Sequence, residues 1–294
     1  MTEFLPKELD TYIYWIHERE VIRIAKEDLN LSPPWTDDKV LQKYKFCQVF
    51  REDDRTTRWF CEHIREPLKD STDVFMATVI FRWFNYIESG KTLIKHDLLC
   101  NWDRKKAIEE ISKQNKWVTG AYIIKTPNRM NKVTGVAECI SHMWKDKNYL
   151  IDKMNSTHSL EDIWNVLRDY PYMGPFMAYE VVTDLRHTYI GYGCDDILTW
   201  ANPGPGAMRG LNRLTGRELG FCKRSHPWNE EMQELLKIAH ERLNNNIIDL
   251  DKFEMREVEG GLCEFDKYSR TVKKEGKTRS IYKYNKDLPL VEGL

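Results

Sequence analysis

Residues 169–185, with the sequence DYPYMGPFMAYEVVTDL, constrain the fold most, because they combine a helix stop and a helix restart. The two prolines of this stretch cannot continue a helix, and a glycine between them permits a left-handed backbone. The pattern therefore predicts a helix ending near Asp169, a turn over 171–174 and a second helix from Pro175 to about His187. Two antiparallel helices joined this closely form a hairpin.

The turn of this hairpin, PYMG, has two interpretations that the residues leave open. It is either a packing connection or a place where backbone N–H groups meet an anion such as a DNA phosphate. In the second case the DNA contacts fall on Tyr172, Met173 and Gly174.

Apolar residues at helical spacing recur along most of the chain, which predicts a mostly α protein with at most a small β element. Its 294 residues suffice for a substantial core. The best strand candidate is GAYIIKT, residues 120–126. The expected helices cover 9–28, 37–68 with a break, 71–87, 103–116, 131–151, 159–169, 228–244 and, in two pieces, 248–270.

For domain organisation we expect a single helical unit over 1–294, with a finer division into lobes. The N-terminal helical lobe covers about 1–155, and the hairpin and catalytic lobe about 156–250. Residues 251–294 contribute a last helix and a polar, basic tail that begins at 271.

Composition excludes several classes of protein. With 45 basic and 46 acidic residues, any nucleic-acid contact must come from a local face. The seven cysteines form no CxxC pair, so we expect reduced thiols and no metal or other cofactor. Apolar runs fall short of the ~20 residues of a membrane span, which predicts no membrane partner and a cytoplasmic protein, or a nuclear one in a eukaryote.

Asp195 and Asp196 are the candidate catalytic acids, in the stretch GCDDILTW. The alternative for two acids before an apolar run is a helix N-cap. They lie 21 and 22 residues after Gly174, and a hairpin followed at this spacing by an aspartate resembles the helix–hairpin–helix DNA glycosylases. The lysine that bifunctional members carry two residues after the hairpin glycine is Phe176 here, which argues against lyase activity.

A second candidate site is NPGPGAMRGLNRL, residues 202–214. Exposed N–H groups at a glycine-rich helix start, together with guanidinium groups, suit a phosphate or pyrophosphate. The alternative is an ordinary turn followed by solvated arginines. Gly204 and Gly206 are candidates for DNA binding here, and Arg209, Asn212 and Arg213 are candidates for binding pyrophosphate or substrate.

Two further groups of polar residues are candidates. Arg51, Asp54, Arg55 and Arg58 share one face of an expected helix, which is usually a solvated ion-pair face. Arg82 and Asn85 lie in the apolar run FRWFN, where a buried arginine requires an acid or a phosphate.

The motifs at 33–59, 81–85, 199–214 and 262–268 together resemble the DNA base hypermodification family. These helical, glycosylase-like proteins are found with 5-hydroxymethyluracil DNA kinases. The family includes the proteins named α-glutamyl/putrescinyl thymine pyrophosphorylases, which are also described as amino acid:DNA transferases of phages. The resemblance spans roughly residues 10–285.

The resemblance implies transfer of an amine, from an amino acid or a polyamine, onto 5-(pyrophospho)methyluracil in double-stranded DNA, with release of pyrophosphate and no cofactor. The target base must leave the stack. Asp196 is favoured over Asp195 as the carboxylate that either deprotonates the amine or stabilises cationic character as the leaving group departs. Pyrophosphate and substrate contacts are then assigned to Arg209, Asn212, Arg213, Arg51, Asp54, Arg82, Asn85 and Trp200.

Two alternatives remain open from the sequence. One is a monofunctional glycosylase that excises a modified pyrimidine, which would leave an abasic site. The other is a non-catalytic DNA-binding partner of a 5-hydroxymethyluracil DNA kinase. The chain has no GxxxxGK[ST] motif, so it is not expected to be a P-loop kinase itself.

Overall fold

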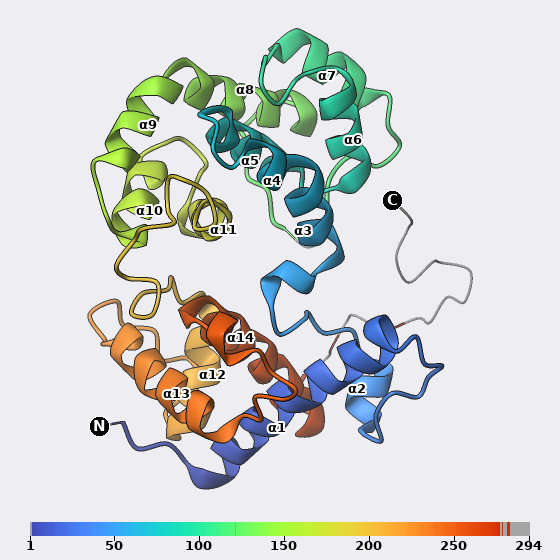
Figure 1. The fold of residues 1–294 in the computed structure, drawn as a ribbon, viewed down its shortest axis with the longest axis vertical. Helices are drawn as coiled ribbons and strands as arrows, with labels where there is room; N and C mark the ends of the chain where they lie inside the picture. Colours follow the sequence, from blue (N-terminus) through green and yellow to red (C-terminus); the bar gives the residue numbers. More distant parts are fainter. Residues whose placement is uncertain (1, 121, 277, 279–280, 283–294) are drawn as a thin grey trace. The chain divides into compact units, whose positions relative to one another are not determined.

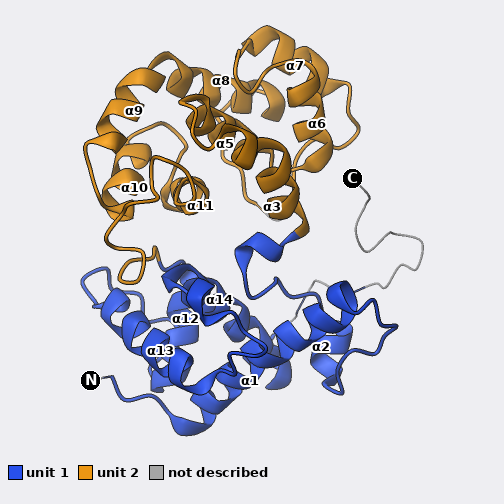
Figure 2. Ribbon diagram, in the orientation of Figure 1, with its two compact units in different colours: residues 1–54, 203–294 blue, residues 55–202 orange. Residues whose placement is uncertain are grey.

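The chain divides into two compact units in a computed structural model that describes residues 2–120, 122–276, 278 and 281–282. Unit 1 comprises Met1–Asp54 and Pro203–Leu294, and unit 2 is the intervening Arg55–Asn202 (Figure 2). Unit 2 is therefore an insertion into unit 1. These boundaries differ from the lobes expected near residues 155 and 250.

Unit 1 is built around the long helices α1 and α14 (Figure 1). Tyr12 of α1 packs edge to face on Phe265 of α14, with ring centroids 5.5 Å apart. Helix α12 lies against α14. The helices of unit 1 are α1 (Pro6–Arg23, continued as a π-helix over Ile24–Asp28), α2 (Lys39–Lys43), α12 (Pro205–Thr215), α13 (Trp228–Arg242) and α14 (Met255–Val272).

Helix α5 is the core of unit 2, because every residue from 74 to 84 is buried. It packs against α11, the second helix of the hairpin. The helices of unit 2 are α3 (Arg55–Phe60), α4 (Glu66–Leu68), α5 (Asp73–Phe84), α6 (Ile87–Lys95), α7 (Arg104–Ser112), α8 (Lys132–Lys145), α9 (Lys147–Asn155), α10 (Leu160–Arg168) and α11 (Pro175–Leu185).

The mostly α prediction is confirmed. The strand predicted at 120–126 is wrong, because residues 120 and 122–126 are irregular, and Ala121 lies outside the described residues. An isolated run of this length has no partner to satisfy its backbone groups. Among the described residues the single β feature is a bridge between Tyr44 and Ile281.

Several helix boundaries also differ from prediction. The helix expected over 131–151 breaks at Asp146, which ends α8 and precedes α9. Helix α6 was not predicted. Of the basic tail, residues 277, 279–280 and 283–294 lie outside the described part of the chain. No helix in the described ranges has the length and apolar content needed to cross a bilayer.

Candidate functional site

The hairpin of unit 2 forms where the sequence predicts it. Helix α10 ends with Asp169 as its C-cap, and α11 begins at Pro175 after Gly174, whose φ is 44°. Met173 is fully buried and anchors the turn, whereas Tyr172 is exposed. Any contact of Met173 with DNA would therefore be through its backbone.

The first turn of α11 leaves donors for an outside partner. The N–H groups of Gly174, Phe176 and Met177 bond to no acceptor among the described residues. A Cβ added at Gly174 would meet nothing within 4 Å, so the turn is open to its surroundings. Helix N-termini with free N–H groups favour anions.

Asp196 is tied to the start of α10. Its carboxylate accepts hydrogen bonds from Ser159 Oγ (2.9 Å) and from the backbone N–H groups of Leu160 (2.7 Å) and Glu161 (3.0 Å). It therefore caps a helix that lies earlier in the chain, whereas the residues directly after it form turns. These three donors occupy most of the roughly four acceptor positions of a carboxylate, so the structure gives Asp196 a positioning role.

Asp195 is fixed in place by a hydrogen bond of its backbone, whereas Asp196 is fixed by hydrogen bonds of its side chain. Its N–H donates to the carbonyl of His158 at 2.8 Å. Its carboxylate is exposed and has no bonding partner among the described residues. The pKa of the buried neighbouring Cys194 thiol is raised to about 11, by burial first and then by the two carboxylates. Cys194 is thus a neutral thiol, and Asp195 is the available acid.

Trp200 fixes the loop after the acids onto the hairpin. Its ring is buried and lies 5.7 Å from Trp164 of α10 and 5.6 Å from Tyr179 of α11, centroid to centroid. Its role is therefore packing, and the buried ring is not placed for the substrate contact expected from the sequence. The loop ends beside the hairpin turn, where Asn202 Nδ2 donates to Pro175 O at 3.4 Å.

An aromatic pair beside the hairpin was missed from the sequence. Phe176, considered only as the replacement of a lysine, is half exposed and meets Tyr122 edge to face at 5.0 Å. The Tyr122 hydroxyl donates to Glu180 of α11. No local pattern signals this pair, because the residues are far apart in the chain.

The glycine-rich segment of unit 1 does not form the expected anion site. Arg213 is buried, with Nε donating to Asp266 (2.7 Å) and Nη2 to Glu275 (2.7 Å). The Gly204 N–H faces the Glu259 carboxylate at 3.3 Å. A Cβ on Gly206 would lie 2.4 Å from Cys263 Sγ, so this glycine serves the close approach of α12 to α14.

The other two members of that segment have different environments. Asn212 is fully buried and donates to Phe221 O at 2.8 Å, which holds the loop after α12. Arg209 Nε lies 3.2 Å from Asp266 Oδ2, but 42% of the Arg209 side chain is exposed. Arg209 is thus the member of the expected pyrophosphate set that keeps an accessible guanidinium.

Arg51 and Asp54 do not lie on a helix face with Arg55 and Arg58. Arg51 begins a 3-10 turn, Asp54 is extended, and α3 starts only at Arg55. Arg51 is buried, and burial raises the pKa of the Asp54 carboxyl. The Gln48 N–H points at Asp54 Oδ1 from 3.5 Å.

Arg82 is satisfied by protein groups within unit 2. It forms a bidentate ion pair with Asp184 (2.5 and 2.9 Å), and Nη1 donates to Asn85 Oδ1 at 2.8 Å. Arg82 and Asp184 are both fully buried. The buried arginine therefore has the acid that the sequence analysis required, and neither it nor Asn85 is placed to hold a pyrophosphate.

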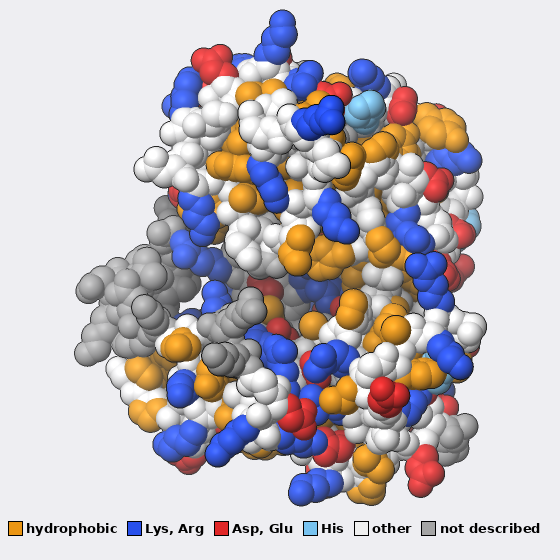
Figure 3. Space-filling model, turned by 180° about the vertical axis from the view of Figure 1, so that it is seen from behind, with side chains coloured by type: hydrophobic (Ala, Val, Ile, Leu, Met, Phe, Trp, Pro, Cys, Tyr) orange, Lys and Arg blue, Asp and Glu red, His pale blue; other side chains and the backbone are white. Residues whose placement is uncertain are grey.

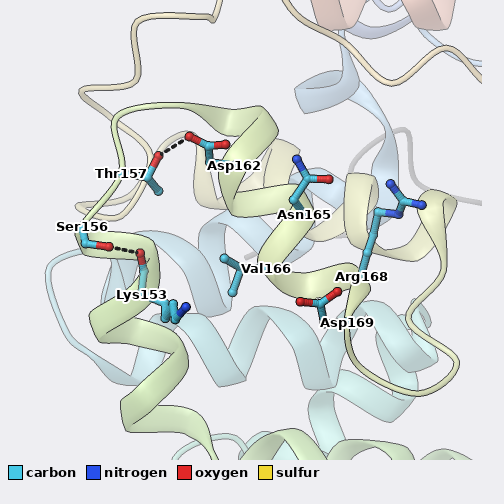
Figure 4. Close-up of a pocket in the computed structure, with 8 residues that line it drawn as sticks. All are labelled: Lys153, Ser156, Thr157, Asp162, Asn165, Val166, Arg168 and Asp169. Atoms are coloured by element: carbon cyan, nitrogen blue, oxygen red, sulfur yellow. Dashed lines mark hydrogen bonds between the residues drawn. The ribbon is translucent and has the colours of Figure 1, made fainter. Parts of the chain in front are cut away.

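A pocket of 490 Å³ lies along α10 and the end of α9 (Figure 4). Thr157 Oγ1 donates to Asp162 Oδ2 at its edge, at 3.0 Å. Its lining consists of Lys153, Ser156, Thr157, Asp162, Asn165, Val166, Arg168 and Asp169.

The face seen in Figure 3 carries side chains of several kinds among its described residues. On the surface seen in Figure 3, Lys and Arg side chains alternate with acidic and apolar ones. Within the described residues, no group of three His, Cys, Asp or Glu side chains is arranged to hold a metal ion.

Comparison with known proteins gives two matches. The profile of a family described as "5-hmdU DNA kinase, helical domain" matches residues 6–278. The protein named "5-hmdU DNA kinase" of Bacillus phage SP10 is 26% identical over 294 residues, covering 88% of this chain and 44% of the phage protein. The chain thus spans less than half of the length of that relative. No solved structure matches the chain.

Proposed function

Because this chain belongs to the family of 5-hmdU DNA kinase helical domains, we propose that it acts on DNA in thymine hypermodification. It transfers an amine onto 5-(pyrophospho)methyluracil and releases pyrophosphate. The observation that carries the proposal is the family match over 6–278, which includes the hairpin and both acids. The family expected from the sequence motifs is confirmed by this match.

The hairpin of unit 2 supplies the DNA contact in this proposal. The N–H groups of Gly174, Phe176 and Met177 have no acceptor in the described part of the chain and sit at the positive end of α11. One backbone phosphate satisfies this end of the helix without reading sequence. Tyr172, exposed at the turn, lies where the DNA would pass.

Asp195 is the proposed base for the transfer. The amine nitrogen bonds to the 5-methylene carbon as the carbon–oxygen bond to pyrophosphate breaks, and the electron pair of that bond leaves with pyrophosphate. The proton lost by the amine passes to the Asp195 carboxylate. Of the two aspartates, Asp195 is the one whose carboxylate is exposed and has no bonding partner among the described residues. Asp196 positions Asp195 by anchoring the loop to α10.

Nucleoside mass spectrometry tests the proposal. DNA carrying 5-(pyrophospho)methyluracil is incubated with the protein and a mixture of amino acids and polyamines. A new amine-bearing nucleoside is expected with the wild type, and its loss is expected with Asp195→Asn. Free base with abasic sites would instead establish a glycosylase and end the transferase proposal.

A second candidate function is that of a non-catalytic partner that presents DNA to a kinase. Two observations favour it: the relative is named a kinase, and this chain covers only 44% of that relative.

The chain itself shows no phosphate loop at its GKT sequence, residues 90–92, because these residues lie inside α6. A Cβ on Gly90 would lie 2.3 Å from Trp59, so Gly90 is a packing residue. DNA that is bound but chemically unchanged in the same assay would support this candidate.

A further inference from the structure

A locally basic segment of unit 2 lies between α7 and α8. Residues 111–137 contain five basic residues and no Asp or Glu, although the whole chain carries 46 acidic and 45 basic residues. In a chain of balanced charge, a run of this length without an acid supplies the local positive charge that contact with a polyanion requires. Most of the segment is the loop that joins the two helices, residues 113–131.

Protein groups hold three of these five cations. Lys113 pairs with an acid of α7, Lys116 lies 4.9 Å from the centroid of an aromatic ring, and Lys132 donates to a loop carbonyl at 2.7 Å. The other two, Lys125 and Arg129, are exposed and form no ion pair among the described residues. They are the cations of the segment that are available to phosphate groups.

The loop is anchored on both sides of Ile123. The Tyr122 hydroxyl donates to Glu180 of α11, and the Tyr122 ring lies 5.0 Å from that of Phe176, centroid to centroid. On the other side, Ile124 is buried. Ile123 itself is 85% exposed, the largest exposed fraction of any large apolar residue in the described part of the chain. The loop thus holds an isoleucine in solvent between two fixed neighbours.

The anchor of this loop connects it to the hairpin. Phe176, which Tyr122 contacts, lies in the first turn of α11, where N–H groups lack acceptors in the described part of the chain. A base that leaves the duplex leaves a gap in the stack. Some DNA-binding proteins insert an apolar side chain such as isoleucine between base steps, which unstacks and kinks the duplex. Ile123 has the exposure and the apolar character for such an insertion.

We propose that residues 122–132 form a second DNA-binding element beside the hairpin turn. Ile123 enters the base stack next to the target base, and Lys125 and Arg129 bind the phosphates that flank it. Ile123 is a positioning residue here, since it stabilises the duplex in its opened form. The inference rests on the DNA contact of the proposed function and is independent of the amine transfer.

Fluorescence of 2-aminopurine tests the insertion. The probe base is placed beside 5-(pyrophospho)methyluracil in a duplex, and the full chain is added to saturation without any amine. Unstacking of the probe should raise its fluorescence severalfold with the wild type, and Ile123→Ala should lose more than about half of this rise. The matched control is Ile94→Ala, which truncates an exposed isoleucine of α6 in the same unit.

Two results would overturn the insertion. One is an equal rise of fluorescence with the Ile123→Ala and Ile94→Ala variants. The other is a duplex that the wild type binds, as measured by anisotropy, without any rise in fluorescence.

The salt dependence of duplex affinity tests the two cations. Lys125→Gln and Arg129→Gln should each lower the slope of log affinity against log salt concentration by roughly 0.9, because each removes one phosphate contact. Lys113→Gln is the control, since Lys113 belongs to the same segment but pairs with α7. A slope lowered equally by Lys113→Gln would show a general effect of charge and would remove the loop from the DNA interface.

The nucleoside assay separates this inference from the proposed function. Unstacking that depends on Ile123, without transfer of any amine, would refute the transferase and support the inserted isoleucine. Amine transfer by the wild type without such unstacking would keep the transferase and refute the insertion. A wild-type protein that binds no duplex would overturn both.

Discussion

Asp195 and Asp196 are neighbours of the same type with different environments, which makes them separable by mutation. Asp196→Ala removes three hydrogen bonds at the start of α10, and the free energy of unfolding should fall by about 1–2 kcal/mol. Asp195→Asn should leave stability unchanged and lower the transfer rate by roughly 10²–10⁴-fold. Urea unfolding and the nucleoside assay measure the two effects.

The opposite result for the two variants would contradict the assignment of Asp195 as the base. Full turnover in Asp195→Asn, with turnover lost in a folded Asp196→Asn protein, would return the base to Asp196, the residue that sequence spacing favours.

The Arg82–Asp184 pair gives a second prediction at the scale of single residues. Asp184→Ala leaves a buried guanidinium without its counterion and should cost about 3–5 kcal/mol of unfolding free energy. The control is Glu109→Ala, which removes an exposed partner of Lys113 and should cost less than about 0.5 kcal/mol. Equal midpoints in urea for these two variants would show that the buried pair is dispensable.

The sequence identifies some of these residues but not their partners. The apolar run around Arg82 shows that it is buried and needs an acid, but Asp184 lies 102 residues away, beyond any local pattern. Likewise, Asp195 and Asp196 cannot be distinguished from spacing, because the difference lies in which side chain meets α10.

At the scale of elements, the two glycine-containing helix starts look alike in sequence and differ in structure. Gly174 precedes α11 with φ 44°, whereas Gly204 precedes α12 with φ −73° and faces Glu259. Gly174→Ala should cost roughly 1–3 kcal/mol through backbone strain and weaken DNA binding. Gly204→Ala, the matched control, should do neither.

Fluorescence anisotropy with a duplex at one fixed salt concentration measures the affinity of both glycine variants. Unchanged DNA affinity in a folded Gly174→Ala protein would reduce the hairpin turn to a packing connection.

Most helices were predictable because their buried faces repeat at helical spacing, as at 9–28 and 159–169, and because prolines mark their limits. Helix α6 was not predicted, and its Gly90 is required by the close approach of Trp59, which lies outside any local pattern. The strand predicted at 120–126 did not form, because strand formation depends on pairing and tertiary context that a single short segment does not contain.

At the scale of the whole molecule, unit 2 is a continuous insertion and unit 1 is assembled from both ends of the chain. Sequence patterns did not predict this division, since it depends on contacts between α1 and the distant α14. The relation to helix–hairpin–helix glycosylases stays a prediction at this scale.

The two units should also respond differently to pH. Burial raises the pKa of Glu257 to about 7 and raises the pKa values of Glu20 and Asp54, and all three belong to unit 1. A carboxyl with a raised pKa in the folded state binds its proton more tightly there than in the unfolded chain. Its stabilisation is therefore complete below the usual value of 4.5 and is lost as pH rises through about 7.

Unit 1 should accordingly lose stability between pH 5 and pH 8, with Glu257 contributing up to roughly 3 kcal/mol. Urea unfolding followed by proteolysis and mass spectrometry reports the peptides of each unit separately. Glu257→Gln keeps an acceptor for the Glu254 N–H and should flatten the pH dependence of unit 1. Two results would contradict this prediction: equal stability of unit 1 at pH 5 and pH 8, or an unchanged pH dependence of its stability in Glu257→Gln. Either result would mean that Glu257 is ionised in the folded state. Its charge would then be balanced by Arg256, the cation that opposes the rise in its pKa.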